Sequence, residues 1–306
     1  MEQIRSFDQL LQEMQAAPSR RVAVAAGHDP HTLQAAAMAA ERQIADITLV
    51  GNKERIEELC REFSIDAGLF DIVDERNDMT AGAIARDMVA EKRADVLMKG
   101  ILSTDNYMRL ILDKEKGLLP QGAVLSHVTV MEIPEYVRTH NKLLFVTDVA
   151  IIPAPDLATK IKLVKYAVGV AQSFGVAEPK VAMLSFSEKV MPKNTSSTDA
   201  CVIAKMGERG QLGRCVVEGP LALDVAISPE DCEIKGLKSS INGDSDVLVF
   251  HCLEASNSFY KACTHFGHTL LAGCVVGAKA PCILTSRADS EKAKLCAIAL
   301  GCRQCR

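Results

Sequence analysis

Short runs of aliphatic and β-branched residues alternate along the chain with longer amphipathic stretches. The runs are apolar at consecutive positions, which is typical of strands buried on both faces of a sheet. Strands are therefore predicted at 21–25, 47–50, 95–98, 143–147, 180–186, 214–217, 246–249, 270–276 and 282–285. Helical spacing predicts helices at 31–44, 53–63, 81–92, 104–112, 157–174, 198–206, 255–265 and 289–300. This alternation predicts an α/β fold with mostly parallel sheets and helices on both faces.

The length of 306 residues favours two domains over one core. Pro153-Ala154-Pro155 is the clearest break in the middle of the chain, and neither a repeat nor a low-complexity linker is present. A cleft between two α/β lobes is the usual place for a ligand, so we expect the active site there.

Composition narrows the class of partner. The 35 Lys and Arg residues against 39 Asp and Glu give a net charge of −4, which disfavours a nucleic-acid partner. An anionic substrate must then be held by local cations and backbone N–H groups. The sequence lacks the roughly 18 consecutive apolar residues of a membrane span and has no signal-peptide pattern at its start, so we expect a cytoplasmic protein with no membrane partner.

The eleven cysteines are expected to be free thiols, because disulfides are rare in large intracellular chains. Cys302-x-x-Cys305 has redox or metal spacing, but no second Cys pair lies nearby. His265-x-x-His268 with Cys263 lacks a carboxylate partner at fixed spacing. We therefore expect no metal site.

Two segments place polar residues directly after a predicted strand. Residues 217–226 contain a Gly-Pro turn followed by Asp224, and residues 283–290 contain Ser286-Arg287-Ala288-Asp289. Ligand sites in α/β proteins form at the carboxyl ends of strands. The residues alone predict an anion-binding α/β enzyme.

A third segment, 99–109, enters a helix through Gly100, Ser103 and Thr104 and carries Arg109 on that helix. Helix N-termini and guanidinium groups both suit phosphate. The alternative is that Ser103 or Thr104 only caps the helix and that Arg109 is solvated.

The segment 218–224 and the Ser-Arg-x-Asp turn resemble motifs of the phosphate acetyl/butyryltransferase family, more closely those of its butyryltransferase branch. The resemblance implies a two-lobed fold similar to isocitrate and isopropylmalate dehydrogenases, with the active site in the cleft. It also implies a discontinuous domain of residues 1–142 and 278–306. The inserted domain would be residues 143–277, which are expected to form a homodimer interface.

The implied activity is reversible transfer of a short-chain acyl group, with butyryl favoured, from coenzyme A to inorganic phosphate. The products are acyl phosphate and free coenzyme A, and no bound cofactor or metal is needed. The resemblance gives Thr104 and Arg109 a role in binding phosphate. It places Ser126 and His127 where acetyl-type relatives have a second phosphate-binding Arg.

Ser286 would hydrogen-bond the developing oxyanion, and the resemblance assigns coenzyme or acyl contacts to Arg287, Asp224, Asn257, Tyr260 and Lys261. Acetyl-type relatives also have an Asp that serves as base for the coenzyme thiol, but that position is Ala293 here. Asp289 is the candidate base and Glu291 the second choice. Capping of the last helix by Asp289, and a helix-terminal structural use of Asp224, are the alternatives.

The chain departs from the family pattern at Phe250-His251, where relatives have Pro-Asp or Pro-Asn. This departure keeps open a non-catalytic acyl-CoA-binding paralogue. A decarboxylating dehydrogenase of similar fold would need an Asp cluster for Mg²⁺ or Mn²⁺ and a nicotinamide site, and neither pattern is present. Acyl-chain length and physiological direction stay open.

Overall fold

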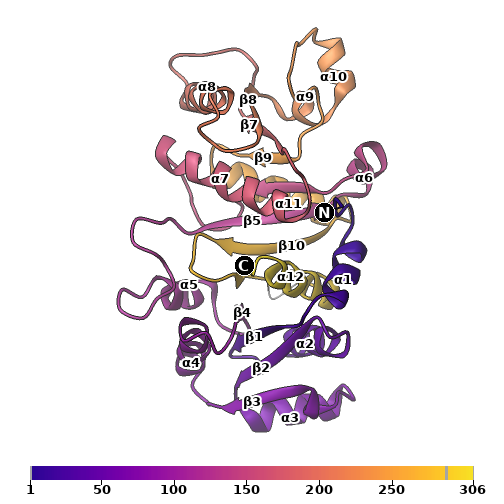
Figure 1. Cartoon of the computed structure of the whole chain (residues 1–306), viewed down its shortest axis with the longest axis vertical. Helices are drawn as coiled ribbons and strands as arrows, with labels where there is room; N and C mark the ends of the chain where they lie inside the picture. The colour runs from indigo at the N-terminus through magenta and orange to yellow at the C-terminus, as the bar shows by residue number, and fades with distance from the viewer. Residues whose placement is uncertain (1, 287–288, 306) are drawn as a thin grey trace. The chain divides into compact units, whose positions relative to one another are not determined.

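The computed structural model describes residues 2–286 and 289–305. The chain forms two compact units (Figure 1). The first, called here the N-terminal unit, consists of Phe7–Leu125 and Ala272–Arg306. The second, the inserted unit, consists of Met1–Ser6 and Ser126–Leu271.

The sheet of the N-terminal unit has the strand order β3-β2-β1-β4-β11-β10. These strands are β3 (Phe70–Asp74), β2 (Ala45–Gly51), β1 (Arg20–Ala25), β4 (Val96–Lys99), β11 (Cys282–Ile283) and β10 (Leu270–Val276). β10 is antiparallel to β11, and the other neighbours are parallel. The parallel strands are short and apolar, as expected for strands covered on both faces.

Helices cover both faces of this sheet: α1 (Phe7–Ala16), α2 (Pro30–Glu41), α3 (Lys53–Glu62), α4 (Asp78–Ala90), α5 (Thr104–Leu112) and α12 (Glu291–Arg303), with the short 3₁₀ helix η1 (Ala67–Leu69). α4 packs against α5 on one face, and α12 packs against α1 and α2 on the other (Figure 1). α12 is the central helix, with ten of its 13 residues buried. A Cβ at Gly301 would lie 2.8 Å from Ile283 Cγ1, so the glycine allows α12 to approach β11 closely.

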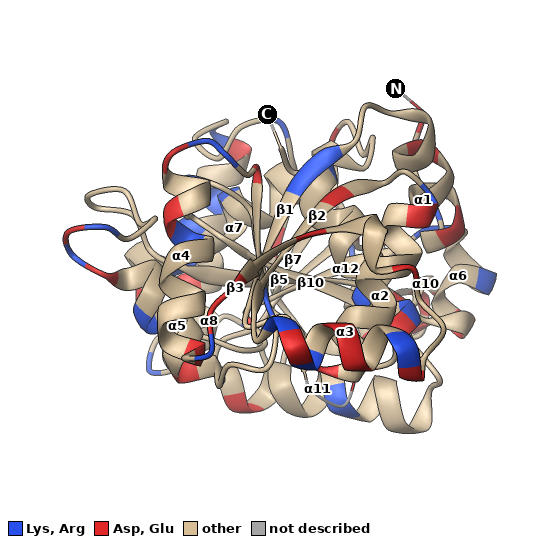
Figure 2. Cartoon of the chain, turned by 90° about the horizontal axis from the view of Figure 1, so that it is seen from below, with Lys and Arg blue, Asp and Glu red and all other residues tan. Residues whose placement is uncertain are grey.

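Side-chain caps define where most of these helices begin. Asp29, Asn52, Asn77, Ser103 and Ser290 accept hydrogen bonds from backbone N–H groups at the starts of α2, α3, α4, α5 and α12. The exposed face of α3 carries charges of both signs (Figure 2), and Lys53–Glu57 and Arg55–Glu58 pair along it.

The sheet of the inserted unit has the order β5-β6-β9-β7-β8. Its strands are β5 (Ser126–Glu132), β6 (Leu144–Thr147), β9 (Val247–Val249), β7 (Lys180–Leu184) and β8 (Val216–Leu221). β5 and β6 are antiparallel, and the remaining neighbours are parallel.

Six helices belong to the inserted unit: α6 (Pro134–His140), α7 (Leu157–Ser173), α8 (Thr195–Glu208), α9 (Leu223–Ile227), α10 (Pro229–Ile234) and α11 (Leu253–Phe266). α7 packs against β5, β6 and β9, while α8 packs against β7 and β8. A core cluster including Leu144, Ala182, Val225 and Leu248 fills the space beneath α9 and α10. Across the described residues, no helix is long and apolar enough to cross a membrane.

The predicted α/β class with mostly parallel strands is confirmed. Two local predictions were wrong. β8 runs through Gly219 and Pro220 to Leu221 and does not end in a turn before them. Pro220 lacks a backbone N–H. It is tolerated because β8 is the last strand in the sheet order, with no further strand on its outer side to accept a hydrogen bond. β5 was also missed, and its antiparallel pairing with β6 groups residues 126–142 with the inserted unit.

Candidate functional site

The carboxyl ends of three adjacent parallel strands meet at one edge of the N-terminal unit. Ala25 of β1 is paired with Lys99 of β4, and Met98 of β4 is paired with Ile283 of β11. The loops after these strands lead into the N-termini of α2, α5 and α12. Unpaired N–H groups and the positive ends of the helix dipoles therefore favour an anion at this edge, called here the strand-end edge.

The loop after β4 is held tightly against the loop after β1. The N–H groups of Gly100 and Ile101 donate to the carbonyl oxygens of Ala25 and Ala26, each at 2.9 Å. A Cβ at Gly100 would lie 2.2 Å from the Ala26 oxygen, so only glycine fits. The buried Lys99 ammonium braces the loop by donating to the Gly100 and Leu102 carbonyl oxygens at 3.0 and 3.1 Å.

Ser103 caps α5, because its Oγ accepts a hydrogen bond from Asn106 N at 3.2 Å. Thr104 and Arg109 are exposed, and neither side chain forms a hydrogen bond or ion pair with another described residue. Five positions separate them, which is about 140° around a helix. They do not share a face, so joint contact with one anion requires Arg109 to extend its long side chain toward the helix N-terminus.

Ser286 lies in a turn after β11 and is exposed. Its N–H donates to Asp289 Oδ2 at 2.7 Å, and its carbonyl oxygen accepts from Asp289 N at 3.3 Å. The Lys294 ammonium donates to the same carbonyl oxygen at 2.8 Å. Arg287, predicted to contact the coenzyme, lies outside the described residues.

The two candidate bases differ in their partners. Asp289 does not cap the last helix, because Ser290 Oγ accepts the hydrogen bond from Ala293 N at 3.2 Å. Glu291 lies 2.6 Å from Nδ1 of His31, and the hydrogen bond from His31 holds the pKa of Glu291 below its usual value. A carboxylate with a lowered pKa is a weaker base.

Ser126 and His127 lie in the inserted unit, at the start of β5. Both are buried. The Asp148 carboxylate accepts from Ser126 Oγ at 2.9 Å and His127 N at 3.0 Å, and its other oxygen accepts from Ala150 N and Ile151 N at 2.8 Å. The role of Asp148 was not predicted from the sequence, because Ser126 and His127, which donate hydrogen bonds to it, are distant along the chain. A phosphate-binding role for Ser126 and His127 stays a prediction.

The other predicted contacts in the inserted unit do not form one cluster of mutual contacts. Asn257 Nδ2 donates to the Val149 carbonyl oxygen at 2.9 Å, which ties α11 to the loop after β6. Tyr260 packs against the core cluster, and the Lys261 ammonium lies 5.5 Å from the centroid of its ring. Their roles toward the coenzyme stay predictions.

Asp224 lies in the first turn of α9 and pairs with Lys235 at 2.8 Å, and its carboxylate is about half exposed. The hydrogen bond from Lys235 lowers the pKa of Asp224. Glu218 has a structural function instead. One of its oxygens accepts four hydrogen bonds, from Ser239 Oγ, Ser240 N, Ser240 Oγ and Ile241 N.

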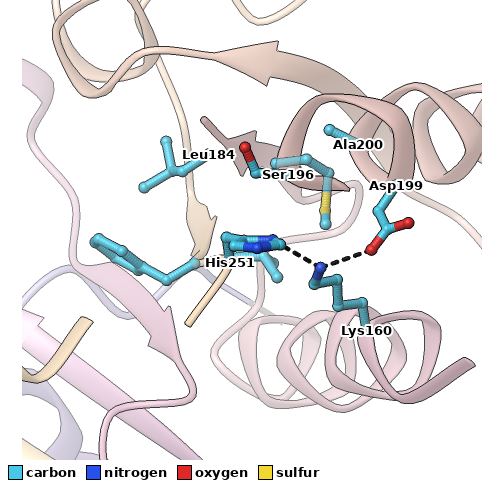
Figure 3. A pocket seen from close by; sticks show the side chains of 9 residues that line it. Lys160, Leu184, Ser196, Asp199, Ala200 and His251 are labelled. Carbon is cyan, nitrogen blue, oxygen red and sulfur yellow. Dashed lines mark hydrogen bonds and ion pairs between the residues drawn. The ribbon is translucent and has the colours of Figure 1, made fainter. Parts of the chain in front are cut away.

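The unusual Phe250-His251 pair borders a small pocket within the inserted unit (Figure 3). Lys160 Nζ donates to Asp199 Oδ2 at 2.7 Å and to His251 Nδ1 at 2.8 Å. His251 therefore carries its proton on Nε2. Burial and the neighbouring Lys160 cation lower the pKa of His251. The pocket has room for about one water molecule.

Lys160 is a further residue that the sequence interpretation missed, although a signal was present. It occupies the buried stripe of α7 with Leu163, Val164 and Ala167, at helical spacing. A lysine on such a stripe must have a polar partner inside the protein. No spacing rule identified Asp199 on α8 as that partner. In residues 2–286 and 289–305, no group of three or more His, Cys, Asp or Glu side chains is arranged to hold a metal ion.

Fold and strand-end edge together define an α/β protein with helix N-termini gathered at the carboxyl ends of parallel strands. The family model described as Phosphate acetyl/butaryl transferase matches residues 6–86 and 77–302. The phosphate butyryltransferase of Clostridium beijerinckii is 38% identical over 297 residues, covering 97% of each chain. The phosphate acetyltransferase of Thermotoga maritima is 35% identical, covering 96% of this chain and 98% of that protein.

Among solved structures, a branched-chain phosphotransacylase from Enterococcus faecalis superposes with a TM-score of 0.81 at 32% identity. The match covers 93% of this chain and 98% of that one. The chain belongs to the phosphate acetyl/butyryltransferase family and is a phosphate acyltransferase. Of the three functions weighed from the sequence, this assignment supports the acyltransferase over the dehydrogenase and the non-catalytic paralogue.

Proposed function

We propose that the protein transfers a short-chain acyl group, butyryl in preference to acetyl, reversibly from coenzyme A to inorganic phosphate. The observation that carries this proposal is the strand-end edge, where Thr104 and Arg109 have no polar side-chain partner among the described residues and Ser286 follows the neighbouring strand. The preference for butyryl rests on the resemblance of residues 218–224 to the motif of the butyryltransferase branch. Overall identity favours neither acyl group, because the butyryltransferase of Clostridium beijerinckii is 38% identical and the phosphate acetyltransferase of Rhizobium meliloti is 39% identical.

In the forward direction, Arg109, Thr104 and the N-terminus of α5 hold phosphate, and one phosphate oxygen attacks the thioester carbonyl carbon. The carbonyl oxygen becomes a tetrahedral oxyanion, which the Ser286 hydroxyl stabilises. The C–S bond then breaks, coenzyme A leaves as thiolate, and acyl phosphate is formed. One oxyanion donor contributes about 3–4 kcal/mol to such a step, and the remaining acceleration comes from holding both substrates in place.

In the reverse direction a base removes the proton from the coenzyme thiol. We assign this role to Asp289, because Glu291 is paired with His31 and has a lowered pKa. Asp289→Asn is expected to slow acyl-CoA formation more than Glu291→Gln. Equal losses would contradict the assignment.

The remaining contacts complete the proposal. We assign contacts with coenzyme A or the acyl group to Arg287, Asp224, Asn257, Tyr260 and Lys261. Ser126 and His127 are proposed as the second phosphate contact. Exchange of each for alanine with separate KM measurements for phosphate and acyl-CoA tests these assignments.

We also keep the proposal of a homodimer formed by residues 143–277. Its support is that several large hydrophobic side chains of the inserted unit are exposed: Phe186, Val190, Val202, Ile234 and Phe266. Exposed apolar side chains of this size are characteristic of protein interfaces. Light scattering that gives the mass of one chain would contradict the dimer.

The acyl preference is tested by following loss of thioester absorbance from acetyl-, butyryl- and isobutyryl-CoA, with and without phosphate. We expect loss that depends on phosphate, with the highest kcat/KM for butyryl-CoA. The absorbance readout avoids thiol-reactive dyes, which the partly exposed cysteines would consume. Phosphate-dependent thioester loss that is fastest with acetyl-CoA would overturn the preference for butyryl. It would still support acyl transfer to phosphate.

A further inference from the structure

Lys294 is a buried lysine on α12 that the reaction described above does not use. Its relative exposure is 3%. Its ammonium donates to the Ser286 carbonyl oxygen at 2.8 Å and to Thr285 Oγ1 at 3.4 Å. Both partners belong to the turn that carries the proposed oxyanion donor.

Three carboxylates act electrostatically on this ammonium, those of Asp29, Asp289 and Glu291. They come from the loop after β1, the turn after β11 and the first turn of α12. Burial lowers the pKa of Lys294, and the charges of these carboxylates oppose that shift because they favour the ammonium form. Burying an ammonium is costly unless hydrogen bonds and charges compensate for it. Here the compensation comes from groups at the strand-end edge itself.

The turn lies beyond the end of the sheet ladder. β11 has only two residues, Cys282 and Ile283, so the sheet ladder ends before Thr285. Two hydrogen bonds join Ser286 and Asp289, and both lie inside the turn. The Lys294 ammonium ties Thr285 and Ser286 to the buried face of α12. It lies directly after Ala293, the position where the resemblance places a base in acetyl-type relatives.

We propose that Lys294 is a positioning residue, whose ammonium fixes the Ser286 backbone so that the hydroxyl meets the thioester carbonyl oxygen. This inference rests on the proposed function. A displacement of about 1 Å at a reacting group can cost about 10²-fold in rate. Loss of the ammonium therefore reduces turnover without removing a group that touches substrate.

The first test is a double-mutant cycle with Lys294→Met and Ser286→Ala. Met has a similar length and no charge. We expect Lys294→Met to lower kcat about 10- to 100-fold, with KM for butyryl-CoA within about twofold of wild type. In the Ser286→Ala background the same change is expected to lower kcat by no more than about twofold, because Lys294 acts through Ser286. Equal losses in both backgrounds would overturn the inference.

Lys292→Met is the matched control, because Lys292 lies on the same helix, is half exposed and pairs only loosely with Asp8 at 3.4 Å. Its kcat is expected to stay within about twofold of wild type. If Lys294→Met lowers the Tm below the assay temperature, all variants of the cycle and the wild type are assayed at a lower temperature, below the Tm of Lys294→Met.

The second test needs no turnover. Hydrogen exchange at the Ser286 amide is expected to be faster in Lys294→Met than in wild type, and unchanged in Lys292→Met. If the wild type shows no phosphate-dependent thioester loss, the proposed function fails, and exchange still decides whether Lys294 holds the turn. Unchanged exchange in Lys294→Met would overturn the inference by itself.

Discussion

Two polar side chains at the strand-end edge of the N-terminal unit differ in their partners from two polar side chains that follow strands of the inserted unit. At the strand-end edge of the N-terminal unit, the exposed Thr104 and Arg109 side chains have no polar partner among the described residues. In the inserted unit, Asp148 follows β6 and accepts four hydrogen bonds, and His251 follows β9 and accepts one from Lys160. Polar groups with partners inside the protein stabilise the fold, whereas those without partners are available to a ligand.

The same contrast separates two buried lysines. Lys160 has a carboxylate partner, Asp199, and the pair joins α7 to α8 inside the inserted unit. Lys294 donates to a backbone carbonyl of the turn that carries Ser286. Loss of the first should therefore affect stability, and loss of the second should affect turnover.

The largest effect is expected on stability when the pair in the inserted unit is broken. Asp199→Ala leaves the Lys160 ammonium buried without its carboxylate, which costs about 3–5 kcal/mol of unfolding free energy. Urea unfolding measures it. Glu208→Ala, on the exposed side of the same helix, is the control and should cost less than about 1 kcal/mol.

Replacing both partners sharpens this prediction. Lys160→Met combined with Asp199→Leu removes both charges, so most of the lost stability should return. A double variant as unstable as Asp199→Ala would show that packing, and not the unpaired charge, dominates.

The next largest effect is expected on catalysis at the strand-end edge. Ser286→Ala should lower kcat about 10²- to 10³-fold, because the oxyanion loses a hydrogen-bond donor. Since Ser286 is exposed, unfolding free energy should change by less than about 0.5 kcal/mol. Steady-state kinetics and urea unfolding measure the two quantities. An unchanged kcat would remove Ser286 from the mechanism.

Arg109→Met should raise KM for phosphate about tenfold or more, since a hydrogen bond to a charged group contributes about 1.5–3 kcal/mol. KM for butyryl-CoA should change much less. Arg55→Met, on the exposed side of α3, is the control. Equal increases in both KM values would argue that Arg109 shapes the whole site and does not bind phosphate specifically.

The smallest effect is expected from pH acting on His251. Its pKa is lowered in the folded protein from the ordinary value of 6.5, so the unfolded chain binds the proton more readily. Unfolding free energy should therefore fall as pH drops from about 7 through about 6.5 and below. His251→Gln should flatten this slope, while His265→Gln at an exposed position should retain it. A slope unchanged by His251→Gln would contradict the prediction.

Most of the strands could be predicted from the sequence. Apolar runs predicted β1, β2, β4, β6 and β7, because strands covered on both faces need no polar residues. β5 was missed because Ser126, His127 and Thr129 make it look polar. Asp148, which lies 22 positions beyond Ser126, accepts hydrogen bonds from Ser126 Oγ and His127 N, and Thr129 Oγ1 lies 3.1 Å from His127 Nδ1. The pattern of apolar and polar residues within a short segment does not show hydrogen-bond partners that lie far along the chain.

Part of the candidate site could also be predicted from the sequence. Gly100, Ser103 and Thr104 between a strand and a helix indicated a helix N-terminus open to an anion, and the structure shows that Ser103 is the cap. The partner of Asp289 was not predictable. Asp and Ser are both common N-cap residues, so either Asp289 or Ser290 could have capped α12. In the structure the cap is Ser290, whose Oγ accepts a hydrogen bond from Ala293 N.

The central claim is that the strand-end edge binds phosphate for attack on an acyl thioester. The most direct measurement follows butyryl-CoA thioester absorbance as the phosphate concentration is raised, for wild type and Arg109→Met side by side. The account predicts a rate that saturates with phosphate in the wild type and needs about tenfold or more phosphate in the variant. Thioester loss that is independent of phosphate, or absent from the folded wild type, would contradict it.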